Sequence, residues 1–199
     1  MSESEGSDRF DLERFVEPPW ARQLDAEAIV RAIPDTAQVR GLLIAPMVPD
    51  AKKRGSLPRE RYLAFNLYPM REHVRLLLDT SSALFPALSL REALRRLGRG
   101  AHGAFGASTL GKVTLGAAEG VHDVIEAFAK GYALNMQPGR AEIIDRGARH
   151  LIVSLDDVLY FIDCHHIGAF EGALGRAGVR GRVRMVPRGR TAADLLLEW

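Results

Sequence analysis

The sequence contains a single cysteine, Cys164, among 199 residues. One thiol cannot close an intramolecular disulfide and cannot supply a zinc site made of several thiolates, which is typical of a reducing compartment. Long apolar runs are missing as well: the stretch 41–48 contains a proline and is far shorter than the roughly 20 residues that cross a bilayer. The first 15 residues are acidic and polar, unlike a secretory signal. We therefore expect a cytoplasmic protein without a membrane helix.

A strong net charge is also missing, because the chain carries only +2 at neutral pH. The charges are nevertheless unevenly placed: residues 1–13 are acidic, whereas residues 176–190 contain six arginines and no acid. Arg180, Arg182 and Arg184 alternate with apolar residues, which predicts a half-buried strand with one solvated basic face. Because no aromatic residues interleave with these arginines, we expect no nucleic-acid partner. The basic face could instead dock an acidic protein partner, including the chain's own N-terminal tail.

Motifs of nucleotide binding are absent or misplaced. The sequence contains no GxxxxGK[ST] loop. Gly98, Gly100 and Gly103 have the spacing of a GxGxxG fingerprint, but they follow a predicted helix and not a strand. We interpret these glycines as turn and packing residues.

The only dense set of metal-ligating side chains is the run Asp163, Cys164, His165 and His166. Adjacent side chains diverge by about 100° on a helix and about 180° on a strand, so they rarely converge on one ion. Cys164 beside two histidines could also act as a nucleophile with its own base, but no orienting group or oxyanion motif accompanies it. We therefore predict no metal site, no catalytic residue, no cofactor and a non-enzymatic protein.

Hydrophobic periodicity predicts an α+β fold: an N-terminal helical half packed on a C-terminal antiparallel sheet with one inserted helix. Helices are expected at 24–34, 69–82, 89–97, 121–132 and within 165–174, and strands at 39–44, 141–145, 151–155, 179–185 and 193–199, with a loop at 46–58. Ser89 and Glu92 form a capping box, and Gly98 is expected to end that helix. Residues 1–20 are interpreted as a disordered acidic tail, and residues 21–199 as a single domain.

Residues 39–199 resemble a myxobacterial paralogous family of unknown function. The resemblance is carried by Tyr68-Pro69 opening a helix, by Leu97-Gly98-Arg99, by the run from Gly168 to Gly172 and by the final strand 193–199. More distantly, the order of elements is similar to the ligand-binding superfamily that unites heme-nitric-oxide-binding domains with vinyl-reductase-type domains. That resemblance implies a fold that holds heme or another apolar small molecule, or that serves as an assembly module.

A heme-binding member would need an axial histidine, and the candidates are His102 and His122. The Tyr-x-Ser-x-Arg propionate clamp of that family is absent from the sequence.

The expected function is therefore a sensor or adaptor in intracellular signalling that binds an apolar small molecule, a protein partner or both, and that is dimeric. The ligand pocket is expected between the helix at 121–132 and the sheet, near Phe128, Tyr132, Tyr160 and Phe170, and the partner surface at the three alternating arginines. The alternatives are a purely structural interaction module that uses this basic strand, a heme-based sensor and an enzyme that uses Cys164.

Overall fold

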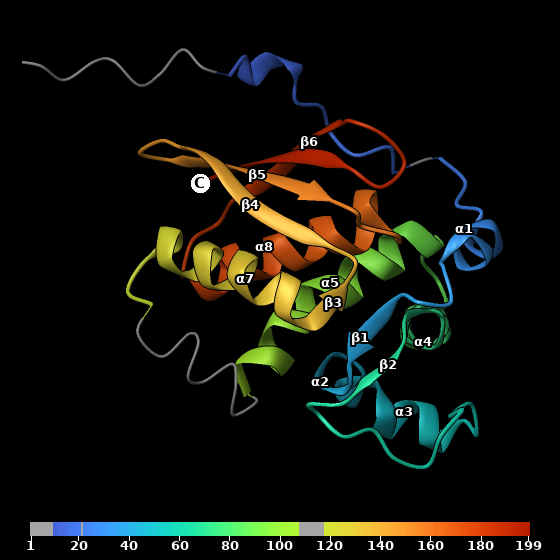
Figure 1. The fold of residues 1–199 in the computed structure, drawn as a ribbon. Helices are drawn as coiled ribbons and strands as arrows, with labels where there is room; N and C mark the ends of the chain where they lie inside the picture. Colours follow the sequence, from blue (N-terminus) through green and yellow to red (C-terminus); the bar gives the residue numbers. More distant parts are fainter. Residues whose placement is uncertain (1–9, 21, 108–117) are drawn as a thin grey trace, which may run out of the picture.

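The computed structural model describes residues 10–20, 22–107 and 118–199 of the chain. It has the predicted α+β fold (Figure 1). The main sheet consists of β4 (Arg140–Arg146), β5 (His150–Asp156), β6 (Arg182–Pro187) and β7 (Ala193–Glu198) in the order β4-β5-β7-β6, with every neighbouring pair antiparallel. The hairpin and the two C-terminal strands are thus confirmed. No helix in these three described ranges is long and apolar enough to cross a membrane.

Two helices cover one face of this sheet, α7 (Val121–Asn135) and α8 (Ile167–Arg176) (Figure 1). Their apolar faces and the inward side chains of β5, β6 and β7 form the first hydrophobic core. The predicted helix at 121–132 is therefore confirmed, and α8 is the helix inserted between strands β5 and β6. A five-residue π-helical turn, η3 (Ile162–His166), leads directly into α8.

The N-terminal half is mostly helical and forms the second core. Its elements are α1 (Ala26–Ala32), β1 (Gln38–Arg40), α2 (Gly41–Ile44), η2 (Ala45–Met47), α3 (Val48–Lys53), β2 (Leu67–Pro69), α4 (Met70–Leu84) and α5 (Leu90–Ala107). A small sheet of order β2-β1-β3, completed by β3 (Met136–Gln137), ties this half to the end of α7. Neither β2 nor β3 was predicted, because each has only two or three residues.

Two of the predicted N-terminal elements are wrong. The strand expected at 39–44 ends at Arg40, and the expected loop at 46–58 contains η2 and α3. The prolines that suggested a loop, Pro46 and Pro49, lie in first turns, where the missing N–H would have no intrahelical partner.

Helix α5 begins as predicted but continues past Gly98. The amide and hydroxyl of Ser89 donate to the Glu92 carboxylate over 3.2 and 2.7 Å, which confirms the capping box. Gly98 does not end the helix: a Cβ at this position would overlap the carbonyl oxygen of His165, and one on Gly168 would overlap that of Arg95. These glycines therefore allow α5 to lie directly against η3 and α8.

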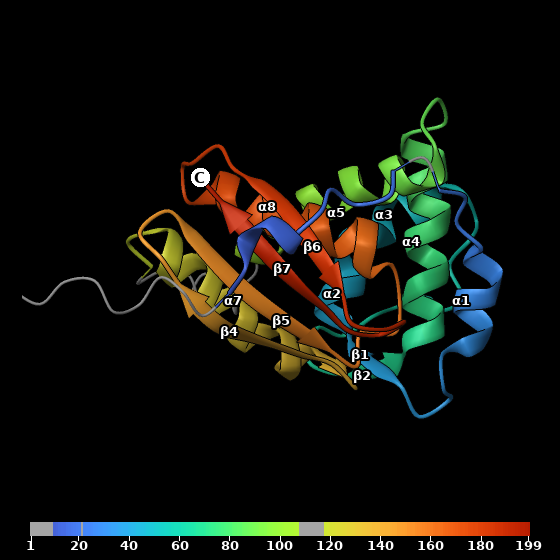
Figure 2. The same cartoon turned by 90° about the horizontal axis from the view of Figure 1, so that it is seen from above.

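Residues 10–20, which were included in the predicted tail, are part of the folded structure. Phe15 is 5% exposed and packs against Ile152 and Leu196 on the outer face of the main sheet. Val16 forms an antiparallel bridge with Met185 of the edge strand β6. Figure 2 shows this segment, in dark blue, crossing the sheet above β7 and β6. The physical reason is that β5 and β7 carry apolar side chains on both faces, and the outer face needs a cover.

Candidate functional site

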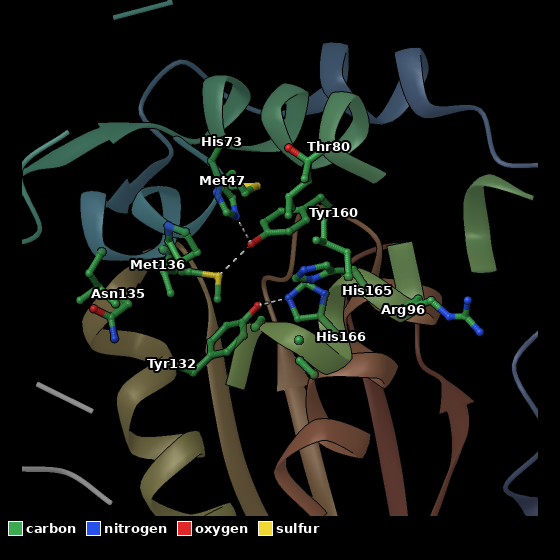
Figure 3. A pocket seen from close by; sticks show the side chains of 18 of the residues that line it. Met47, His73, Thr80, Arg96, Tyr132, Asn135, Met136, Tyr160, His165 and His166 are labelled. Carbon is green, nitrogen blue, oxygen red and sulfur yellow. Dashed lines mark hydrogen bonds between the residues drawn. The ribbon is translucent and has the colours of Figure 1, made fainter. Parts of the chain in front are cut away.

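A cavity of about 330 Å³ lies where the two cores meet. The N-terminal side contributes side chains from α2, η2 and α4, and α5 contributes another wall. The opposite walls are α7, η3 and the segment before η3 (Figure 3). Most of the lining is apolar, from Leu42, Leu43, Met47, Leu77, Leu84, Phe85, Leu97, Phe128, Met136 and Ala169. The volume is at the lower end of the ~300–1,000 Å³ typical of small-molecule sites.

A hydrogen-bonded set of three side chains on the cavity wall, His73, Tyr160 and Met136, joins α4 to the segment before η3. Nε2 of His73 lies 3.2 Å from the hydroxyl of Tyr160, and that hydroxyl donates to Sδ of Met136 over 3.2 Å (Figure 3). Nδ1 of His73 is inaccessible and has no partner among the described residues, which favours a proton on Nε2, and Nε2 then donates to the Tyr160 hydroxyl. Burial lowers the pKa of His73 to about 3, so this imidazole is neutral at physiological pH.

A second polar group joins α7 to η3. Nδ1 of His166 lies 3.3 Å from the carbonyl oxygen of Phe161, which can only accept, so Nδ1 carries the proton. Nε2 of His166 therefore accepts from the hydroxyl of Tyr132 over 2.8 Å (Figure 3). Burial lowers the pKa of His166 to about 4 and raises that of Tyr132 well above its ordinary value. Both groups are thus uncharged.

His165 lies beside these pairs, and its side chain has no hydrogen bond to any residue that the structure describes. Its ring is 5.5 Å from that of His166 and 6.2 Å from that of Tyr160, measured between centroids. Only 8% of the residue is exposed, and Nδ1 is inaccessible and has no partner among the described residues. Burial lowers the pKa of His165 well below its ordinary value.

The structure places three of the four predicted ligand-binding residues on the cavity. Phe128, Tyr132 and Tyr160 line it, whereas Phe170 is fully buried in the first core, in edge contact with Phe128 at 4.9 Å between centroids. The cavity also lies between α7 and the N-terminal helices, not between α7 and the sheet as predicted. The sequence prediction missed His73, and it discounted His165 and His166 because adjacent side chains were expected to diverge.

The side chains from Asp163 to His166 are not part of any group of three or more His, Cys, Asp or Glu residues, within the described ranges, that is arranged to hold a metal ion. Asp163 pairs with Arg91 at 2.7 Å, and burial raises the pKa of the Cys164 thiol to about 12. A thiol in this environment is protonated at neutral pH and is a poor nucleophile.

The three arginines of the predicted partner surface differ in their surroundings. Arg182 and Arg184 both donate to the carboxylate of Glu198 on the neighbouring strand over 2.9 Å, and Arg184 also donates to the carbonyl oxygen of Phe15. Arg180 precedes β6 and is exposed. The side chains of Arg182 and Arg184 thus hold β6 to β7, and Arg184 also contacts the N-terminal segment, through the backbone carbonyl of Phe15 and not through an acidic side chain.

Solved structures of H-NOX proteins share this fold. An oxygen-binding H-NOX domain related to soluble guanylate cyclases matches with a TM-score of 0.61 and 14% identity, over 79% of this chain and 91% of that one. The Fe(II) unliganded H-NOX protein from K. algicida matches with a TM-score of 0.58 and 10% identity, over 80% and 96% of the two chains. At this identity the likeness establishes the fold alone.

Heme does not fit the residues that the structure describes around the cavity. Nε2 of His73 and both ring nitrogens of His166 already have protein partners. His165 is flanked by the rings of Tyr160 and His166, at 6.2 and 5.5 Å between centroids. The one cation among the lining residues described is Arg96, and its guanidinium points away from the cavity histidines (Figure 3). Of the two axial candidates, His122 bonds to the carbonyl of Gly147 outside the cavity, and the side chain of His102 lies outside the described part.

The sequence comparisons give a family but no activity. No curated protein matches the chain. The model of the family described as "Protein of unknown function (DUF2378)" matches residues 36–199, which include every wall of the cavity and the whole main sheet. The chain belongs to this family.

Proposed function

We propose that this protein is a non-enzymatic sensor domain that binds an apolar small molecule in the cavity between its two cores. The observation that carries the proposal is the cavity itself. Small-molecule sites in proteins are concave, mostly apolar and few per protein. A hollow of about 330 Å³ with a mostly apolar lining is therefore a feature that a bound molecule would explain.

The position of the cavity supports a sensing role. Its walls come from both cores, and Met136 packs against the two of them. A molecule in this position would contact α4 and α5 on one side and α7 on the other, and its binding energy would favour one relative packing of the two halves. Occupancy could then be transmitted to a protein partner as a change in this packing.

The test is displacement of a neutral fluorescent probe, N-phenyl-1-naphthylamine, together with native mass spectrometry of the freshly purified chain. We expect the probe to bind, with blue-shifted emission, and apolar competitors to displace it. Leu97→Trp places an indole on the cavity wall and is expected to abolish binding. The matched control is Leu134→Trp on α7, where the side chain is 61% exposed and is not part of the lining.

The outcome that contradicts the proposal is equally specific. If the probe does not bind and native mass spectrometry shows only the mass of the chain, the cavity is not a ligand site. Equal binding by the two tryptophan variants would place the probe elsewhere on the molecule. An absorption band of heme in the purified protein would replace the proposed ligand by a heme group.

A further inference from the structure

The polar groups on the cavity wall indicate which chemical class of molecule the proposed ligand belongs to. The inference therefore depends on the proposed function. Of the three cavity histidines, His73 and His166 are bonded to tyrosine hydroxyls, whereas His165 has no hydrogen-bond partner in the described residues. His165 is therefore the cavity histidine whose ring has a nitrogen left to bond a ligand, because neither of its nitrogens is taken by a described residue.

The surroundings of His165 fix which of its nitrogens carries the proton. Nδ1 is sealed off and unpartnered, so Nε2 is the ring nitrogen left to bond a molecule in the cavity that His165 lines. A buried N–H without an acceptor is rarer in proteins than a buried acceptor without a donor. The favoured tautomer thus has a bare Nδ1 and a proton on Nε2. His73 has the same arrangement, with Nε2 as the donor and an inaccessible, unpartnered Nδ1.

The charged residues of the described lining are Asp50, which pairs with Lys53, and Arg96, whereas the groups around His165 carry no formal charge. The groups that face His165 are His166, Tyr160 and, beyond it, His73, and all three are uncharged at neutral pH. The Asp163 carboxylate is paired with Arg91. Figure 3 shows the guanidinium of Arg96 pointing away from the histidines. A carboxylate or ammonium next to His165 would lose its hydration without gaining a counter-ion.

We infer that the cavity takes an uncharged molecule with an apolar body and one hydrogen-bond-accepting oxygen, a carbonyl or an ether, and that Nε2–H of His165 donates to this oxygen. The apolar body would occupy the space between Met47, Leu77 and Phe128. The single donor then selects for the oxygen, since the polar groups beside it, His73, Tyr160, Tyr132 and His166, are already bonded within the protein.

The experiment compares three ten-carbon competitors against N-phenyl-1-naphthylamine: decane, decan-2-one and decanoate. In the unmodified chain we expect decan-2-one to bind about tenfold more tightly than decane, the value of one added hydrogen bond. Decanoate is expected to bind more weakly than the ketone. In His165→Phe, which keeps an aromatic ring and removes both nitrogens, the preference for the ketone over decane should fall to within about twofold. His122→Phe, outside the cavity, is the matched control and should keep the tenfold preference.

Each result decides between the two proposals. If decane, the ketone and the probe all fail to bind, the proposed function itself is wrong. If the probe and decane bind but the ketone has no advantage, or keeps it in His165→Phe, the cavity is a ligand site and the role of His165 is wrong. Tightest binding by decanoate would overturn the inference that the ligand is uncharged. The ranking in the unmodified chain requires no variant, so it tests the ligand class even if His165→Phe does not fold.

Discussion

Acidification should destabilise this protein well above the pH at which its carboxylates titrate. His73 and His166 are buried and neutral, with pKa values of about 3 and about 4, compared with an ordinary value of about 6.5 in the unfolded chain. At pH values between the folded-state and unfolded-state pKa, the unfolded state binds protons that the folded state does not. The contribution of these histidines to the free energy of unfolding is therefore fully present above about pH 6.5 and decreases as the pH falls.

The magnitude follows from the two pKa differences. Protonation of the unfolded state between about pH 7.5 and about pH 4.5 costs about 2.5 kcal/mol for each of His73 and His166, or about 5 kcal/mol together. His165, whose pKa is also lowered, adds to the loss in the same direction. Since a typical domain is stable by about 5–15 kcal/mol, this is a large part of the total.

Urea unfolding followed by circular dichroism at several pH values measures the effect. Glu171 and Glu198 have lowered pKa values, so their contribution is present above the ordinary glutamate pKa and is lost only as the pH falls below it. The interval from about pH 6.5 to about pH 5 therefore isolates the histidines. In His73→Phe the slope of stability against pH should decrease by about 1 kcal/mol per pH unit over this interval. A stability that is flat over this interval, or an equal decrease in His122→Gln, would refute the assignment of buried neutral histidines.

Three further predictions concern other parts of the fold. Gly168→Ala should destabilise the protein by about 2 kcal/mol or more, because the added Cβ would overlap a carbonyl oxygen of α5. Gly175→Ala on the same helix has open space around it and should be neutral or stabilising by up to about 1 kcal/mol. Urea unfolding measures both effects. Cys164 should resist a thiol reagent at neutral pH in the folded chain and react fully in urea; rapid labelling of the folded chain would revive the hypothesis of a nucleophilic thiol. Arg184→Glu should lower the melting temperature, because the new carboxylate would face that of Glu198. Arg180→Glu, the control, should leave the melting temperature unchanged. Equal melting temperatures of the two variants would show that the pairing of Arg184 with Glu198 is not stabilising.

The elements that the sequence predicts well are those with a long periodic pattern. Helix α7, the β4–β5 hairpin and the strands β6 and β7 each have apolar side chains at the spacing of their type, and each forms where expected. The errors lie where a local signal has two meanings. Gly98 is a common helix end, but here it serves the contact between α5 and η3, and prolines 46 and 49 are compatible with a loop or a first turn.

The N-terminal segment shows a different limit of sequence reasoning. Its composition is that of a disordered tail, and nothing in its own pattern requires order. Phe15 is nevertheless buried because the outer face of β5 and β7 presents Ile152 and Leu196. Order in residues 10–20 is thus decided by a surface more than a hundred residues away in the chain, which a local pattern cannot reveal.

Sequence reasoning named only some of the residues that line the cavity, for a related reason. Three of the four aromatic residues expected at a pocket do line it, because large apolar side chains on one helical face lie near a core interface. The histidines escaped because the argument that adjacent side chains diverge assumes a regular helix or strand. The segment Ile162–His166 is a π-helical turn that follows Phe161, whose φ of 42° lies in the left-handed region.

A left-handed phenylalanine costs free energy that the surrounding structure must offset. Phe161 is 2% exposed in the second core, and its carbonyl oxygen accepts the Nδ1 proton of His166, so the same residue that is strained also fixes the tautomer of a cavity histidine. The π-helical turn that follows places His165 and His166 together on the cavity wall. Strained turns and π-helical segments are concentrated at functional sites in proteins. A cavity that merely resulted from imperfect packing would need neither feature, and this favours a wall shaped to present one donor to a bound molecule.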